Sequence, residues 1–286
     1  MNTIEFMADP VLRAVFLPGI VAALAIAVLC GVLSVFVVTK RLAFVSQGVS
    51  HAAFGGVGIA LVLGLGAPTW GGSMAVVFLF CVGAALAMGW LGRRSSTGPD
   101  TAIGIVLVAS MAIGFILHRH ASLAIANDGG VAPPGLDEVL FGSIANVTWP
   151  EAMLACGVSL VVLAMVWWFR RQLVFFAFDE PAAEAFGVRV GLVRALLMVL
   201  LAGAVVVTMR LAGVVLATAL LVIPGAAALA LSARLKAVFV ASLVVSVVGV
   251  VVGLVVSFEW NLQIGPGVAL ALCVLWTGAR LTGRGS

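Results

Sequence analysis

The sequence predicts an all-α polytopic membrane protein with eight to nine transmembrane helices. Two features of its composition predict this class: 64% of the 286 residues are hydrophobic and only 9% are charged. Soluble domains average about 25% charged residues, so a chain with so few charges could not cover a surface that faces water. The same composition excludes an intrinsically disordered chain, which requires low hydrophobicity and high charge.

The third observation is a series of long uncharged runs, which predicts the spans in order. A stretch of glycines and a proline between Gly64 and Gly72 divides the longest run into two spans. Arg210 separates two other runs so closely that eight full spans plus a half-helix remain an alternative to nine. One domain, 1–286, is the simplest organisation. The runs are Ala14–Thr39, the two halves of Leu42–Leu91, Thr101–Leu117, Ala152–Phe169, Ala195–Met209, Leu211–Ala233, Ala237–Phe258 and Trp260–Ala279.

The distribution of Lys and Arg predicts the orientation of these spans. With an outside N-terminus, all but three of the 15 basic residues fall in inside loops, as expected from the positive-inside rule. The exceptions are Arg13, Arg119 and Arg210. The C-terminus is therefore expected inside. Two longer loops follow from this arrangement: 119–151 outside and 172–192 inside.

The inside loop contains the pattern of a short capped helix between Phe178 and Val188. Asp179 is a suitable N-cap, Pro181 lies in the first turn, and Gly187 ends the helix. A short helix with the apolar side chains of Phe178 and Phe186 at its ends suits docking into a groove on a partner. A helix lying on the lipid surface is the alternative, although such helices are usually rich in Lys and Arg. This helix instead carries three acids, Asp179, Glu180 and Glu184.

A polar motif lies just inside the second span, at Ser46–His51. Ionisable residues within a membrane span suggest a function. Gln47 and His51 are four residues apart, so a helix places both on one face. Histidine is a common ligand of transition metals, and a His hydrogen-bonded between helices is the alternative interpretation.

Two weaker features lie elsewhere. His118 and His120, at the end of the fourth span, could chelate a metal together only if the chain were extended there; a solvated helix end is the alternative. Pro224 lies within an apolar run, where a proline removes a backbone donor and kinks the helix. Such a break suits a transport pathway but also occurs in ordinary packing.

Several motifs are absent from the sequence. No G-x-x-x-x-G-K-[ST] motif is present, so the chain is not expected to hydrolyse ATP itself. No H-E-x-x-H or G-x-S-x-G motif supports an intramembrane protease or hydrolase. The four cysteines fall within spans, where they are expected to be small packing residues.

Taken together, these residues resemble the permease family of ABC importers for zinc, manganese and iron, which have a type II importer fold. The resemblance runs in the family's order from about Val11 to Arg280. Its motifs are an opening signature at 35–44 with Val49–Ala53, an outer-loop motif at Leu140–Ile144, a coupling helix at Phe178–Gly187, a broken-helix segment at Ala219–Pro224 and a final outer turn at Asn261–Pro266.

The resemblance implies the partners of the chain. Two permease copies, most simply a homodimer, would sit on a cytoplasmic ABC ATPase dimer in the bacterial inner membrane. An extracytoplasmic metal-binding protein would dock on the outer face. The ATPase would hold ATP and receive Asp179, Glu180, Glu184, Phe186 and Gly187 of the coupling loop. No permanently bound cofactor is expected, and the divalent metal ion is the cargo.

The sequence departs from the family at the expected metal site. The family usually has Asp four residues before the His of the second span, and here that position is Gln47. An amide offers a dipole but no charge, so a buried dication would be poorly compensated. Three interpretations remain: the site is a weak stepping point, Glu259 compensates from the outer end, or the cargo differs from the family norm.

Two other functions remain as alternatives. A related ABC permease for a metal chelate, of the siderophore or vitamin B12 type, would share the architecture. An intramembrane enzyme that uses His51 with Ser50 or Ser46 belongs to a different class, and no acid lies near these residues in sequence.

Overall fold

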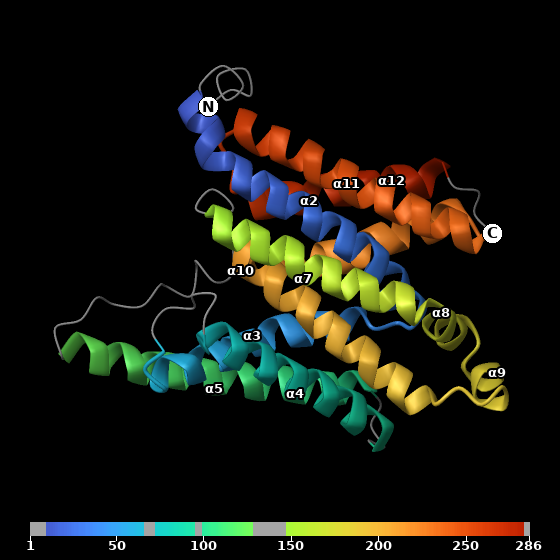
Figure 1. Cartoon of the computed structure of the whole chain (residues 1–286), viewed down its shortest axis with the longest axis horizontal. Helices are drawn as coiled ribbons and strands as arrows, with labels where there is room; N and C mark the ends of the chain where they lie inside the picture. The colour runs from blue at the N-terminus through green and yellow to red at the C-terminus, as the bar shows by residue number, and fades with distance from the viewer. Residues whose placement is uncertain (1–9, 66–71, 95–98, 128–146, 283–286) are drawn as a thin grey trace.

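The computed structural model describes residues 10–65, 72–94, 99–127 and 147–282, and all regular structure within these ranges is helical. The prediction of an all-α protein is confirmed. Figure 1 shows the helices α2 (Pro10–Thr39), α3 (Ala43–Val62), α4 (Gly72–Arg94), α5 (Pro99–Asn127), α7 (Trp149–Trp168), α8 (Arg170–Phe178), α9 (Glu180–Ala185), α10 (Val190–Leu231), α11 (Leu235–Glu259) and α12 (Ile264–Thr282).

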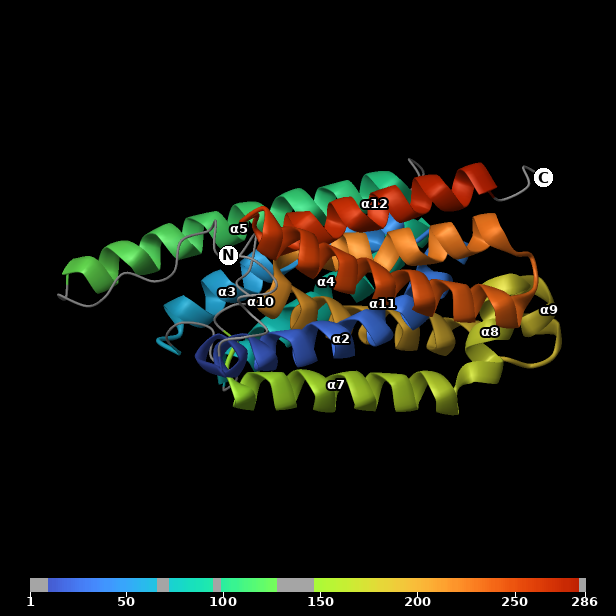
Figure 2. The ribbon, with the colours of Figure 1, turned by 90° about the horizontal axis from the view of Figure 1, so that it is seen from above.

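Within the described ranges, eight helices are long and apolar enough to cross a membrane, namely all except α8 and α9. The expected division of the longest run is confirmed, since α3 ends at Val62 and α4 begins at Gly72. The long helices run side by side, and α8 and α9 lie together at one end of the bundle (Figure 2). We call this the α9 end.

α10 is too long for a single crossing. Its 42 residues would extend about 63 Å as a straight helix, twice the hydrocarbon thickness of a bilayer. The helix is interrupted at Gly213, where φ is 80° and ψ is 169°. Only glycine adopts this backbone conformation readily. Residues 190–212 form a first arm and residues 214–231 a second arm.

Contacts with α2 show that the two arms run in opposite directions. In the first arm, Thr208 Oγ1 lies 3.6 Å from Cys30 Sγ. In the second arm, the Gly225 N–H donates to Ser34 Oγ, one turn further along α2. The bend itself lies near Ile26, which precedes Cys30 on α2. The second arm therefore returns toward the α9 end (Figure 1).

The break that we expected at Pro224 lies earlier, at Gly213. Pro224 lies inside the second arm, and Gly213 is the residue of α10 that leaves helical φ and ψ. A proline removes one N–H but its fixed φ is compatible with a helix, whereas the reversal in α10 uses a positive φ that favours glycine. Pro224 therefore remains within the second arm, and the chain reverses its direction at Gly213.

The predicted outer loop also begins later than expected. α5 continues through Arg119 and ends at Asn127, so the first residues of 119–151 are helical, as are Trp149 to Glu151 at the start of α7. α5 extends beyond its neighbours at the end opposite α9 (Figure 2). The outer-loop motif Leu140–Ile144 lies outside the described residues.

The helices form two groups around α10. α3, α4 and α5 pack together on one side, and α2, α11 and α12 pack on the other (Figure 1). α3 and α5 cross closely: a Cβ at Gly114 would lie 2.6 Å from the Phe54 carbonyl carbon. This close crossing buries most of α3 and fixes which of its faces stays open.

Candidate metal pathway and coupling helix

One face of α3 remains open although most of the helix is buried. Phe44 is 59% exposed, Gln47 is exposed and His51 is half-buried, whereas Val45, Ser46 and Val49 are buried. The spacing of three and four residues places these open positions on a single helical stripe. The structure therefore brings Gln47 and His51 onto one face, as the sequence predicted.

The His51 ring packs against an aromatic side chain, and one of its two ring nitrogens lacks a hydrogen-bond partner among the described residues. It stacks on Phe54 at a centroid distance of 6.3 Å, and Phe54 stacks in turn on Phe115. Its Nδ1 is buried and has no hydrogen-bond partner among the described residues. Because Nδ1 is enclosed within the chain, a metal ion or a second chain could reach His51 only from the open side of its ring.

The neighbouring serines do not form a nucleophile with His51. Ser46 Oγ donates to the Ala43 carbonyl at 2.7 Å, and Ser50 Oγ donates to the Ser46 carbonyl at 2.9 Å. Both hydroxyls are bonded to their own helix backbone. This geometry gives no support to an intramembrane enzyme that uses Ser50 or Ser46.

The structure does not bring the weaker metal candidates together. His118 and His120 both lie in α5, where the backbone is helical, so residues two apart point in different directions. Their joint chelation, which required an extended chain, is therefore ruled out by the helix. The Ser122 hydroxyl lies 3.4 Å from His118 Nδ1.

Glu259 also lies apart from His51 within one chain. It ends α11, which packs on α2, α10 and α12, whereas α3 packs mainly on α4, α5 and α10. Among the described residues, no three His, Cys, Asp or Glu side chains gather closely enough to hold a metal ion.

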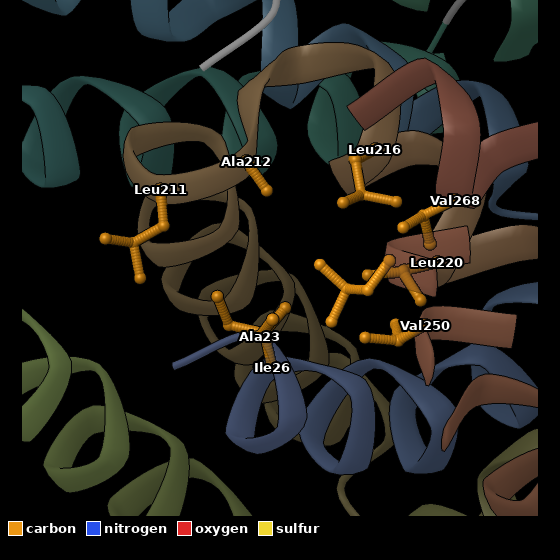
Figure 3. A pocket seen from close by; sticks show the side chains of 9 residues that line it. Ala23, Ile26, Leu211, Ala212, Leu216, Leu220, Val250 and Val268 are labelled. Atoms are coloured by element: carbon orange, nitrogen blue, oxygen red, sulfur yellow. The ribbon is translucent and has the colours of Figure 1, made fainter. Parts of the chain in front are cut away.

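A small cavity lies beside the bend of α10. Figure 3 shows that its side chains are all apolar and come from several helices. Its volume of about 10 Å³ is close to the minimum for one water molecule, and a cavity without polar partners stays dry. The bend therefore offers no metal ligands. The labelled residues in Figure 3 are Ala23, Ile26, Leu211, Ala212, Leu216, Leu220, Val250 and Val268.

Charged residues join the bend to α7. The Arg210 guanidinium donates to Glu151 Oε1 at 3.1 Å, and the Thr148 backbone N–H donates to Glu151 Oε2 at 2.9 Å. Glu151 thus caps the start of α7 and holds the first arm of α10 beside it. Arg210, which divided two apolar runs in the sequence, marks the end of the first arm.

The coupling helix forms as its sequence predicted. Asp179 is the N-cap of α9 and accepts a hydrogen bond from the Ala182 N–H at 3.0 Å. Gly187 follows the helix with a φ of 80°, which favours glycine. Phe186 is 80% exposed and Glu184 is exposed as well. Of the residues that the resemblance assigns to ATPase contact, Asp179 and Gly187 are exposed as well, and Glu180 is half-buried.

Glu180 forms two ion pairs within the chain that were not expected from the sequence. Its Oε2 accepts from Lys40 Nζ at 2.5 Å, and its Oε1 accepts from the Arg194 guanidinium. Lys40 follows α2 and Arg194 lies near the start of α10, so both carboxylate oxygens are used within the chain. No local pattern indicates this cluster, because its members are far apart along the chain.

Comparisons with known proteins identify the family. The model of the ABC 3 transport family matches residues 13–282, and the chain belongs to this family of ABC permeases. An uncharacterized membrane protein of Synechocystis is 32% identical over 261 residues, which cover 90% of this chain and 87% of the relative.

Two further relatives extend the comparison. The manganese transport system membrane protein MntC of Halalkalibacterium halodurans is 29% identical over 96% of this chain and 90% of its own length. The solved structure of PsaBC from Streptococcus pneumoniae in complex with Fab has a TM-score of 0.81 at 25% identity. The match covers 98% of this chain and 95% of the PsaBC chain, so the whole fold described above is that of an ABC permease.

Proposed function

We propose that two copies of this chain form the membrane pathway of an ATP-driven importer for a divalent transition-metal ion. The observation that carries the proposal is the open stripe of α3, on which the half-buried His51 lies one turn from the exposed Gln47. Manganese is the first candidate because the relative from H. halodurans is named for its transport. Zinc and iron follow from the sequence resemblance.

A second copy would complete the ligand set. Two α3 helices that face each other across a pathway would contribute two imidazoles and two amide oxygens, both of which bind transition metals. Without a carboxylate this set holds a dication weakly, because its charge is not offset. Weak binding suits transport, since an ion must leave the site as readily as it enters.

The ATPase and the extracytoplasmic metal-binding protein would be separate chains. The chain has no ATP-binding motif of its own, so ATP would bind to a separate cytoplasmic ABC ATPase dimer. This dimer would contact the exposed surface formed by Glu184, Phe186 and Gly187. An extracytoplasmic metal-binding protein would dock at the end opposite α9. ATP binding and hydrolysis would then switch the permease pair between outward and inward states.

The α9 end would face the cytoplasm, with the C-terminus inside and the N-terminus outside. The described basic residues cluster at helix termini of this end, as the positive-inside rule requires. Arg119 and Arg210 lie towards the opposite end. The basic residues of the α9 end are Lys40, Arg41, Arg93, Arg94, Arg170, Arg171, Arg189, Arg194, Arg234, Lys236 and Arg280.

Reconstitution tests this function. The chain is co-expressed with its ATPase and placed in proteoliposomes, and the uptake of manganese, zinc and iron is measured with and without ATP and metal-loaded binding protein. We expect ATP-dependent uptake of a free metal ion that is lost in His51→Ala and kept in Ser50→Ala, whose hydroxyl is bonded to its own helix. Uptake of a metal chelate alone, or unchanged uptake in His51→Ala, would overturn the proposal.

A further inference from the structure

The strongest unexplained feature is the charge cluster around Glu180, which joins three separate elements. Glu180 is the first residue of α9, and its two carboxylate oxygens form ion pairs with Lys40 and Arg194. The cluster is partly shielded from solvent, since the side chains of Glu180 and Lys40 are 28% and 16% exposed. We refer to Lys40, Phe176, Glu180 and Arg194 as the Glu180 cluster.

An aromatic ring forms the floor of the cluster. Phe176 is fully buried in α8, and Lys40 Nζ lies 4.1 Å from the centre of its ring. The Arg194 guanidinium carbon lies 5.7 Å from the same centre. Both cations are therefore held between the ring face and the Glu180 carboxylate, which also offsets their mutual repulsion.

α9 has little else to hold it to the membrane helices. It has six residues, of which Ala183 alone is buried, and Asp179 is occupied with capping it. A force applied to α9 by a partner would therefore reach the rest of the chain through α8, through the short link 186–189 to α10 and through the ion pairs of Glu180. The two partners of Glu180 determine where the force through its ion pairs goes.

Lys40 and Arg194 each adjoin a different element of the proposed pathway. Lys40 lies between α2 and the start of α3 at Ala43, the helix that carries Gln47 and His51. Arg194 lies in the first turns of α10, whose first arm runs to the bend at Gly213. One carboxylate thus connects the coupling helix to both elements.

The surroundings of the cluster leave room for movement. Lys40, Phe176, Glu180 and Arg194 line a cavity of about 480 Å³ that also borders the starts of α3 and α5. The side chains of Lys40, Glu180 and Arg194 therefore border open space on one side, whereas Phe176 is buried beneath them. The ion pairs can adjust within this space while they remain formed.

We propose that Glu180 is a positioning residue that transmits movement of α9 to the start of α3 and to α10, instead of binding the ATPase itself. This inference rests on the proposed function, because it requires an ATPase that acts on α9. Without the carboxylate, two cations would face each other over Phe176, and α9 would move without pulling on α3. ATP would then be hydrolysed with little transport.

The test measures metal uptake and phosphate release together in proteoliposomes that contain the permease–ATPase complex. For Glu180→Gln we expect normal co-purification of the ATPase, ATP hydrolysis close to the wild-type rate, and at least about a fivefold fall in ions carried per ATP, the lower limit of typical coupling between sites. Arg280→Met is the control, because it removes an exposed charge from the same end of the bundle.

A second pair of variants keeps the test decisive if Glu180→Gln does not fold. Lys40→Met is expected to lower the ratio of ions to ATP, and Lys40→Arg to retain it. The double variant Lys40→Met with Glu180→Gln should lower the ratio of ions to ATP no further than either single variant, because each substitution breaks the same Lys40–Glu180 ion pair. A wild-type ratio in Glu180→Gln or Lys40→Met, or loss of ATPase binding in Glu180→Gln, would overturn the inference. Absence of uptake by the wild-type complex would instead contradict the proposed function.

Discussion

The backbone N–H of Gly225 donates a hydrogen bond to Ser34 Oγ at 2.7 Å, and this contact joins the second arm of α10 to α2. Pro224, the preceding residue, has no N–H to donate, so the regular helix ladder is already interrupted here. A Cβ at Gly225 would lie 2.5 Å from the Ser34 carbonyl oxygen. The two helices therefore approach until their backbones nearly touch.

Gly225→Ala should destabilise the protein because backbone atoms cannot move aside easily. We expect a loss of about 1–3 kcal/mol, which is typical of overpacking in a well-packed core. The measurement is the thermal unfolding of purified protein in detergent. Gly83→Ala is the matched control, since a Cβ there meets no atom within 4 Å, and it should be neutral or slightly stabilising. Equal unfolding of the two variants would contradict the close approach.

Gly213→Ala should also destabilise the protein, through backbone strain rather than a clash. Its φ of 80° and ψ of 169° lie in a region that is essentially restricted to glycine, so alanine should cost about 1–3 kcal/mol. Gly203→Ala in the first arm is the control, because the nearest atoms to its Cβ lie at an ordinary 3.7 Å. If both variants melt at the same temperature, the chain does not reverse at Gly213.

Gln47→Asp should strengthen metal binding in the proposed pathway. A carboxylate one turn from His51 would offset part of the charge of a dication, which an amide cannot do. We expect the KM for uptake to fall about tenfold, equivalent to about 1.4 kcal/mol, and the maximal rate to fall as release slows. Initial uptake rates over a range of metal concentrations measure both values. An unchanged KM would show that position 47 does not face the ion.

Phe186→Asp should weaken binding of the ATPase. Exposed aromatic residues at the centre of an interface often contribute about 2 kcal/mol or more, and Phe186 is 80% exposed beside Phe175. Co-purification and quantitative binding of the ATPase provide the measurement. Leu281→Asp is the control: Leu281 is 83% exposed near the end of α12, at the same end of the bundle. Similar losses in both variants would indicate a general effect of charge on the complex.

The sequence predicted those parts of the fold that depend on local rules. Long apolar runs defined the spans, and the capping residues Asp179 and Gly187 placed α9 correctly because both act within one or two turns. The shared face of Gln47 and His51 followed from their spacing alone. These features need no knowledge of which helices meet.

Features that depend on long-range packing could not be predicted. Glu180 and Lys40 are 140 residues apart, and Gly225 and Ser34 are 191 residues apart, so no local pattern connects them. The separation of two apolar runs at Arg210 suggested a half-helix near the reversal, but the exact position at Gly213 was not evident, because a glycine in an apolar run resembles any small packing residue. For His118 and His120 the helical interpretation is the one that the structure confirms, since α5 continues to Asn127.

The small size of α9 has a consequence for evolution. Glu180 and Ala183 hold the helix against the bundle, while Glu184 and Phe186 remain exposed. If this exposed surface binds the ATPase as proposed, it could change together with a diverging ATPase without any change in the packing of the membrane helices. Specificity for the ATPase and specificity for the cargo would then diverge independently in one gene.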